Sequence, residues 1–198
     1  MKRREALKNI GLGTGFVVVT PGLISLLQSC TDDVETWTPA FLSVEEGQVL
    51  TRLVDTILPK SDIPSATEVN VPQFIDKFIN EVSDDEEQAM IKEGFGNLLG
   101  IVKSDYNEKL VKVSDKDYKD LLDKHMRIKG EDDEERIANP DSMEPTTSEF
   151  LNQIKWMTIN AYKTTEEIGE NVLAYDPVPA AYYCGDLDEL TGGKSWSL

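Results

Sequence analysis

Apolar residues recur at intervals of three and four along most of this chain, and that spacing limits it to helices. The first such stretch follows Ser43 and runs from Val49 to Leu58, where Pro59 ends the pattern. No segment alternates apolar and polar residues over enough positions to indicate a strand. The sequence therefore predicts an all-α fold.

About five helices are expected, and most have a recognisable start. Ser43, Ser83 and Ser114 each precede acidic residues at capping positions, and Pro72 opens the second helix. The expected core positions, helix by helix, are Val49, Leu50, Leu53, Val54, Ile57 and Leu58; Phe74, Ile75, Phe78, Ile79 and Val82; Met90, Ile91, Phe95, Leu98, Leu99 and Val102; Tyr118, Leu121, Leu122 and Met126; and, after a start at Thr147 or Ser148, Phe150, Leu151, Ile154, Met157, Ala161 and Tyr162.

Two stretches interrupt these patterns. The third helix contains Gly94, Gly96 and Gly100, each of which weakens a helix by up to about 1 kcal/mol relative to alanine, so we expect close packing or a kink there. Residues 128–147 are acidic, and we expect a charged, poorly ordered connection. The single domain would span residues 43–198 and end in an irregular arm.

The first 29 residues have the pattern of an export signal. Arg3-Arg4 with Leu7-Lys8 precedes a charge-free stretch from Asn9 to Thr31, and a positive region followed by an apolar one is typical of secretion. The arginine pair favours the twin-arginine route, which exports proteins that have already folded. An ordinary secretory signal is the alternative.

Cys30 follows Leu27-Gln28-Ser29, as in a lipoprotein cleavage site. Cleavage there would make Cys30 an acylated N-terminus and residues 30–42 a lipidated tether. The protein would then be periplasmic and bound to a bacterial membrane through its lipid. A retained membrane span is the alternative, since about 20 apolar residues suffice, although several glycines dilute this stretch.

The charge of the chain excludes one class of partner. The leader holds four basic residues and one acidic residue, so the mature part has 16 basic and 36 acidic side chains and a formal net charge of −20. Nucleic-acid binding depends on basic side chains that neutralise phosphates. We therefore expect no nucleic-acid partner and a solvated, mutually repelling surface.

Few side chains suggest catalysis. His125 is the one histidine and no Cys–Cys spacing occurs, which excludes the usual zinc sites. The patterns of dinucleotide sites, P-loops, c-type haem attachment and EF-hands are missing. We expect no catalytic residue, no cofactor and no metal in this chain, a solvent-facing His125, and a Cys184 that is either buried or placed against a partner.

The C-terminal arm combines rigid prolines with aromatic rings and holds too much apolar surface to remain solvated. It either wraps over its own helices or contacts another protein, because aromatic residues are enriched in interface cores. The candidate partner interface consists of Tyr175, Pro177, Pro179, Tyr182, Tyr183 and Cys184.

Three blocks are distinctive in their order and spacing. They are Arg3-Arg4 with Leu7-Lys8; Leu53 to Pro59 with Asp62 to Ala66 and Val69 to Asp76; and Phe150-Leu151 with Thr164 to Gly169 and Leu173 to Gly185. In these blocks the chain resembles the gluconate 2-dehydrogenase subunit 3 family, while the middle, about 84–147, matches only in helical character. The family often has Pro-Gly-Ala after the loop aspartate, where this chain has Ile63-Pro64-Ser65-Ala66.

The resemblance implies a non-catalytic small subunit of a periplasmic or membrane-associated dehydrogenase. In that family the large subunit is of the glucose–methanol–choline type, holds FAD and oxidises a sugar or sugar acid, and a cytochrome c with haem c often takes the electrons. This chain would escort, stabilise and anchor the flavoprotein, since one leader can export both. The alternatives are a free-standing acidic surface lipoprotein that binds a glycan or a cation, and an enzyme in its own right.

Overall fold

The computed structural model describes residues 37–127, 133–178 and 184–197. The chain divides into two compact units, Met1–Trp37 and Thr38–Leu198. The first unit falls almost entirely outside the described residues, and with it lie the predicted signal residues Arg3, Arg4, Leu7, Lys8 and Cys30.

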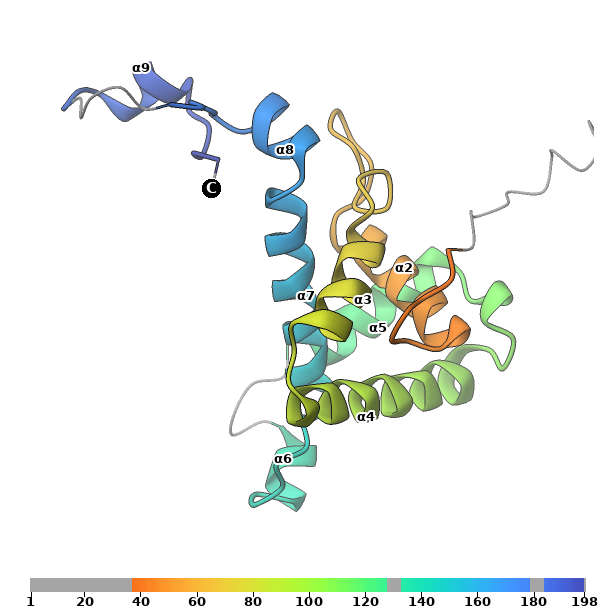
Figure 1. Ribbon diagram of the computed structural model, residues 1–198. Coiled ribbons are helices and arrows are strands. Elements are labelled where there is room, and N and C mark those ends of the chain that lie inside the picture. The colour runs from red at the N-terminus through yellow and green to blue at the C-terminus, as the bar shows by residue number, and fades with distance from the viewer. Residues whose placement is uncertain (1–36, 128–132, 179–183, 198) are drawn as a thin grey trace, which may run out of the picture. The chain divides into compact units, whose positions relative to one another are not determined.

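The second unit is helical, which confirms the predicted all-α class. Its α-helices are α2 (Val44–Ile57), α3 (Val71–Glu81), α4 (Asp85–Ile101), α5 (Asp115–His125), α6 (Glu134–Ala138), α7 (Thr147–Lys163), α8 (Glu166–Asn171) and α9 (Leu187–Thr191) (Figure 1). A π-helical turn (Val102–Tyr106) continues α4, and a 3-10 turn (Leu110–Lys112) precedes α5.

Helices α2 and α7 lie at the centre of the core. α2 contacts α3, α4, α5 and α7, and α7 also contacts α3, α4, α5 and α8. Leu50, Leu53 and Val54 of α2 are fully buried, as are Leu151 and Ile154 of α7. The five longer helices predicted from the sequence thus supply most of the core, because their apolar faces meet around these two helices.

The helix starts agree with the sequence in part. Ser43 and Ser114 form the predicted capping boxes of α2 and α5. The cap of α4 is Asp84 rather than Ser83, and the cap of α7 is Thr146, which forms a capping box with Glu149. The cap of α4 is one position later than predicted, since neighbouring Asp and Ser side chains compete for the same backbone N–H groups, whereas α7 begins at Thr147, one of the two predicted starts.

The apolar face predicted for α3 is wider than the face that the core covers. Ile75 and Ile79 are buried, but Phe74, Phe78 and Val82 are 50%, 43% and 65% exposed. We call these three exposed residues the α3 stripe. A helix that meets its neighbours on one side covers only part of its circumference, so a second apolar row remains in solvent.

Asp76 of α3 binds the segment that precedes α2. Its carboxylate accepts hydrogen bonds from the backbone N–H groups of Ala40, Phe41 and Leu42, at 2.6, 3.1 and 2.8 Å, and Asp76 is only 2% exposed. Hydrogen bonds to a charged acceptor are roughly twice as strong as neutral ones. The helical unit therefore begins before the expected Ser43, within the region predicted to be a tether.

A second set of contacts holds the same segment from α4. Lys92 donates to a carboxylate oxygen of Glu46 at 2.6 Å, and its Nζ lies 5.6 Å from the centroid of the Phe41 ring. Glu46 also accepts from the backbone N–H of Ser43 at 2.7 Å. The start of α2 is consequently fixed to both α3 and α4.

Close packing at Gly94 brings α4 against α7, as the glycines of this helix predicted. A Cβ atom added at Gly94 would lie 2.4 Å from the Phe150 ring, whereas one added at Gly96 would meet nothing within 4 Å. The rings of Phe95 and Phe150 also make an edge-to-face contact, with centroids 5.1 Å apart. Figure 1 shows α4 crossing the first turns of α7 at this point.

These two glycines provide a matched pair of substitutions. Gly94→Ala should lower the free energy of unfolding by about 1–3 kcal/mol, because the new methyl group overlaps a fully buried ring. Gly96→Ala should raise it by up to about 1 kcal/mol, because alanine is the better helix former. Urea unfolding followed by circular dichroism measures both, and equal effects would contradict the close contact at Gly94.

Candidate partner-binding surface

The C-terminal segment leaves the helices after α8 and returns to them, forming a closed loop. Ala174 and Trp196 make a parallel bridge, in which the N–H of Ala174 donates to Ser195 O at 2.9 Å and the N–H of Ser197 donates to Ala174 O at 2.8 Å. We call residues 174–197 the C-terminal loop. Its base is therefore fixed by backbone pairing between residues more than 20 positions apart.

The base of this loop lies against α8. A Cβ atom added at Gly169 would be 3.0 Å from Ser197 Oγ, so the glycine leaves room for the returning chain. Within the loop, Asp186 caps α9 by accepting from the N–H groups of Asp188 and Glu189. Gly192 and Gly193 then take positive φ angles of 63° and 77°, which glycine adopts without strain, and they end α9.

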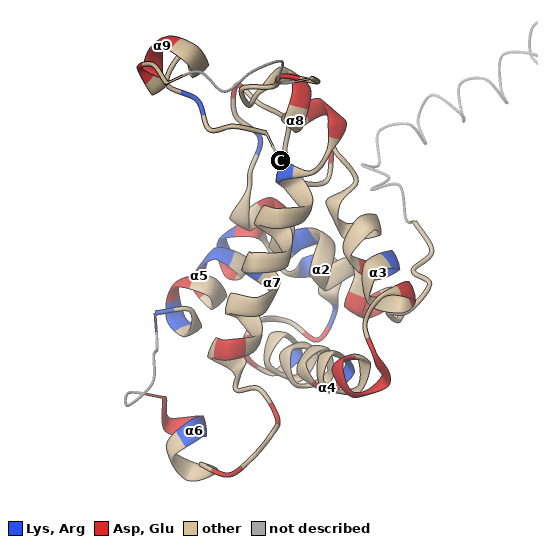
Figure 2. Ribbon diagram, turned by 60° about the vertical axis from the view of Figure 1, so that its left-hand side comes forward, with Lys and Arg blue, Asp and Glu red and all other residues tan. Residues whose placement is uncertain are grey.

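The described part of the loop exposes an unusual amount of apolar surface. Its large apolar side chains are between 45% and 76% exposed, and Figures 1 and 2 show α9 apart from α2 to α7. Exposed apolar surface gathered in one segment marks an interaction site more often than single exposed residues do. The exposed side chains are Tyr175, Val178, Leu187, Leu190 and Trp196.

The structure places part of the predicted interface in this loop. Tyr175, Pro177 and Cys184 are exposed, and Cys184 is a free thiol. Pro179, Tyr182 and Tyr183 lie outside the described residues. Leu187, Leu190 and Trp196, which are also exposed in this loop, are not among the predicted interface residues, because polar residues separate them in the sequence and no apolar pattern marks them.

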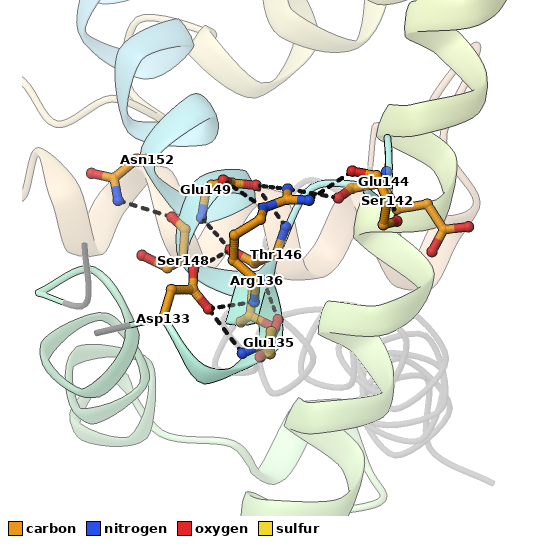
Figure 3. Close-up of polar contacts among 10 residues, drawn as sticks. Asp133, Glu135, Arg136, Ser142, Glu144, Thr146, Ser148, Glu149 and Asn152 are labelled. Atoms are coloured by element: carbon orange, nitrogen blue, oxygen red, sulfur yellow. Dashed lines mark hydrogen bonds and ion pairs between the residues drawn. The ribbon is translucent and has the colours of Figure 1, made fainter. Parts of the chain in front are cut away.

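The acidic connection differs from its expected character over residues 133–147. There the structure contains the short helix α6 and a polar network that joins it to α7 (Figure 3). The Arg136 guanidinium donates to the Glu149 carboxylate and to the carbonyl oxygens of Ser142 and Glu144. The single cation Arg136 thus orders a stretch in which the many carboxylates would otherwise repel one another.

Asp133 completes the network in Figure 3. Its carboxylate accepts from the backbone N–H groups of Glu135 and Arg136 and, at 2.6 Å, from the hydroxyl of Thr146. The hydrogen bond from Arg136 and another from the Thr146 N–H lower the pKa of Glu149. Each of these groups is engaged in holding α6 to α7, so we assign the network a structural role.

Two hollows in the described surface are polar and open. One, of about 440 Å³, lies beside the Arg136 network and is lined by Asn97, Asn139 and their neighbours. The other, of about 880 Å³, lies between the loop that precedes α3 and the start of α8, where Lys60 pairs with Glu68. Small-molecule sites are mostly apolar and enclosed, so neither hollow resembles one.

His125 is half-buried rather than facing solvent as predicted. Its Nε2 is buried without a hydrogen-bond partner among the described residues. Burial, and secondarily the charge of Lys124, lower the pKa of the imidazole, while Glu135 and Asp105 partly oppose that shift. Nε2 of His125 therefore forms no hydrogen bond with a serine or cysteine among the described residues.

Two further properties concern the part of the chain that the structure describes. It holds no group of three or more His, Cys, Asp or Glu side chains placed to bind a metal ion. Within residues 37–127, 133–178 and 184–197, every helix is too short or too polar to span a bilayer.

Shortening the chain tests how the loop is held. A chain that ends at Gly193 lacks the strand partner of Ala174, so limited proteolysis should cut residues 175–193 faster. The unfolding temperature should fall by only about 2–4 °C, because the net loss is about 1 kcal/mol of exposed backbone hydrogen bonding. An unchanged cleavage pattern would show that other contacts hold the loop.

The depressed pKa of His125 predicts a pH dependence of stability. Above about pH 6.5 the imidazole is neutral in both states. As the pH falls below that value the unfolded chain takes up the proton first, so the free energy of unfolding drops until the folded-state pKa is passed. His125→Gln should flatten this slope in chemical unfolding between about pH 7.5 and 5.5, and an equally steep slope in the variant would assign it to carboxylates.

The comparison with family models supports the resemblance seen in the second sequence block and in most of the third. The family model of gluconate 2-dehydrogenase subunit 3 matches residues 44–180, which include α2 to α8 and the start of the C-terminal loop. No curated protein and no solved structure matches the chain. Because the match spans more than half of its 198 residues, this chain belongs to the gluconate 2-dehydrogenase subunit 3 family.

Proposed function

We propose that this chain is the non-catalytic small subunit that escorts, stabilises and membrane-anchors a periplasmic FAD-dependent sugar or sugar-acid dehydrogenase of the glucose–methanol–choline type. Family membership supports the coarse statement, since the family is that of a subunit of a dehydrogenase complex. The main support for the binding of a partner comes from the C-terminal loop. It presents apolar side chains to solvent on a segment fixed at both ends.

The loop is suited to binding another protein because its base is already ordered. Pre-ordering a binding segment reduces the entropy lost on association. Trp196 is one of the two bridged residues at that base and Tyr175 follows the other, and they are 45% and 46% exposed. Tyrosine and tryptophan are enriched among binding hot spots. Cys184 is exposed in the same segment.

The leader supports the escort role. A twin-arginine signal suits a cargo that folds around its cofactor before export, and the sequence patterns of cofactor sites are missing from this chain. The flavin would belong to the large subunit, which would bind this chain in the cytoplasm and leave with it. Acylation at Cys30 would then hold both subunits at the membrane, and a cytochrome c would receive the electrons.

Co-purification tests the assembly. The protein, solubilised gently from native membranes, should elute with a yellow, flavin-containing partner of roughly 60 kDa, the scale of a two-domain enzyme. Absorbance near the flavin band and mass spectrometry identify that partner. A colourless monomer of full stability would refute the proposal and favour a free-standing acidic lipoprotein.

Exchanging Arg3 and Arg4 for lysine tests the escort role. Because the twin-arginine route requires the arginine pair, both subunits should accumulate in the cytoplasm, as measured by cell fractionation and immunoblotting. Lys2→Gln, which keeps the pair, is the control and should be exported normally. A flavoprotein that still reaches the periplasm in the double variant would remove the escort role and leave the assembly intact.

A further inference from the structure

The α3 stripe is an apolar surface that the fold does not use. Phe74, Phe78 and Val82 recur every four residues on one side of α3, and each is at least 43% exposed. The rings of Phe74 and Phe78 are stacked, with centroids 6.2 Å apart and an interplanar angle of 23°. Two adjacent exposed rings on a regular helix make a rigid surface, because a helical backbone leaves only the side-chain torsions free.

Two other sides of α3 are occupied, while a polar side with Lys77, Asn80 and Glu81 is exposed. Val71, Ile75 and Ile79 face the core and are buried. Asp76, which holds the segment from Ala40 to Leu42, lies about 160° around the helix axis from both Phe74 and Phe78, at about 100° per residue. The segment Ala40–Leu42 therefore lies on the side of α3 opposite the α3 stripe.

The surroundings of the stripe are strongly acidic. Between Ser61 and Ile91 the sequence has eight acidic residues and one basic residue, Lys77, and Lys77 pairs with Glu81 at 3.9 Å. Val82 is followed by the exposed run Asp84–Glu87 at the start of α4, coloured red in Figure 2. Any surface that covers the stripe must approach this concentrated negative charge.

The negative charge around the α3 stripe distinguishes between the molecules that could cover it. A second copy of this chain would place like charge against like charge, at a cost of several kcal/mol. An anionic bilayer would be repelled in the same way, because its attraction for proteins depends on Lys and Arg. A protein with an apolar groove bordered by basic residues satisfies both the rings and the carboxylates.

We propose that the α3 stripe is a second docking surface for the flavoprotein subunit, which receives Phe74 and Phe78 in an apolar groove and places Lys or Arg side chains against Asp84–Glu87. This inference rests on the proposed function. The binding mode is that of a helix in a groove, with anchors spaced four residues apart. The partner would thus contact the chain at α3 as well as at the C-terminal loop.

Titration of the purified flavoprotein, obtained by the co-purification above, tests this surface. Phe74→Ala with Phe78→Ala should raise the Kd at least about 100-fold, since buried aromatic anchors dominate binding energy. Val82→Ser should raise it about tenfold, while Val111→Ser, at a valine that is 82% exposed elsewhere, should change it less than about twofold. Unchanged unfolding temperatures establish that the variants are folded.

Charge reversal and two controls complete the test. Glu86→Lys should slow association several-fold, and the wild-type affinity should fall as salt rises. Wild-type binding with undiminished binding by the double phenylalanine variant would overturn this inference and leave the proposed function standing. A wild-type chain that binds no flavoprotein would overturn the proposed function itself.

Other occupants give distinct results. A dimer in sedimentation that the double phenylalanine variant dissociates would identify a second copy. Flotation with phosphatidylethanolamine–phosphatidylglycerol vesicles that the same variant abolishes would identify the membrane. Either outcome would overturn the assignment to the flavoprotein.

Discussion

The arrangement of this subunit depends on one buried carboxylate. Asp76 accepts hydrogen bonds from three backbone N–H groups of residues 40–42, and burying a polar side chain without such donors costs free energy. The interaction joins the start of the helical unit to α3, which follows α2 after the loop of residues 58–70. It places residues 40–42 on one side of α3 and so covers that side of the helix.

The Asp76 contact therefore helps to determine which sides of α3 are covered. Its core side is covered by α2 and α7, and its Asp76 side is covered by the segment before α2. The exposed part of α3 consists of a polar side with Lys77, Asn80 and Glu81 and the side with Phe74 and Phe78. Rotating the helix to bury the two rings in the core would move Asp76 away from its three donors. The Asp76 contact therefore keeps positions 74 and 78 at the surface.

The sequence predicted the helices better than their surroundings. Apolar spacing and caps located α2, α3, α4, α5 and α7, because both signals are local. The same spacing could not tell Phe74 from Ile75, since periodicity reports which residues are apolar and not how many neighbours cover them. The acidic composition likewise predicted a poorly ordered stretch where α6 forms, because composition does not show that Arg136 binds several oxygen atoms there. The base of the C-terminal loop, at Ala174 and Trp196, depends on a contact between distant residues that no local pattern reveals.

Charge and apolar surface act together in this chain. The C-terminal loop and the α3 stripe expose side chains that would favour self-association in a neutral protein. A formal net charge of −17 opposes that association, because two copies repel each other before their apolar surfaces meet. With a partner that has basic residues around its apolar grooves, the long-range electrostatic interaction is attractive instead of repulsive. On the proposed function, the same acidity makes the two apolar surfaces selective for a partner with basic residues.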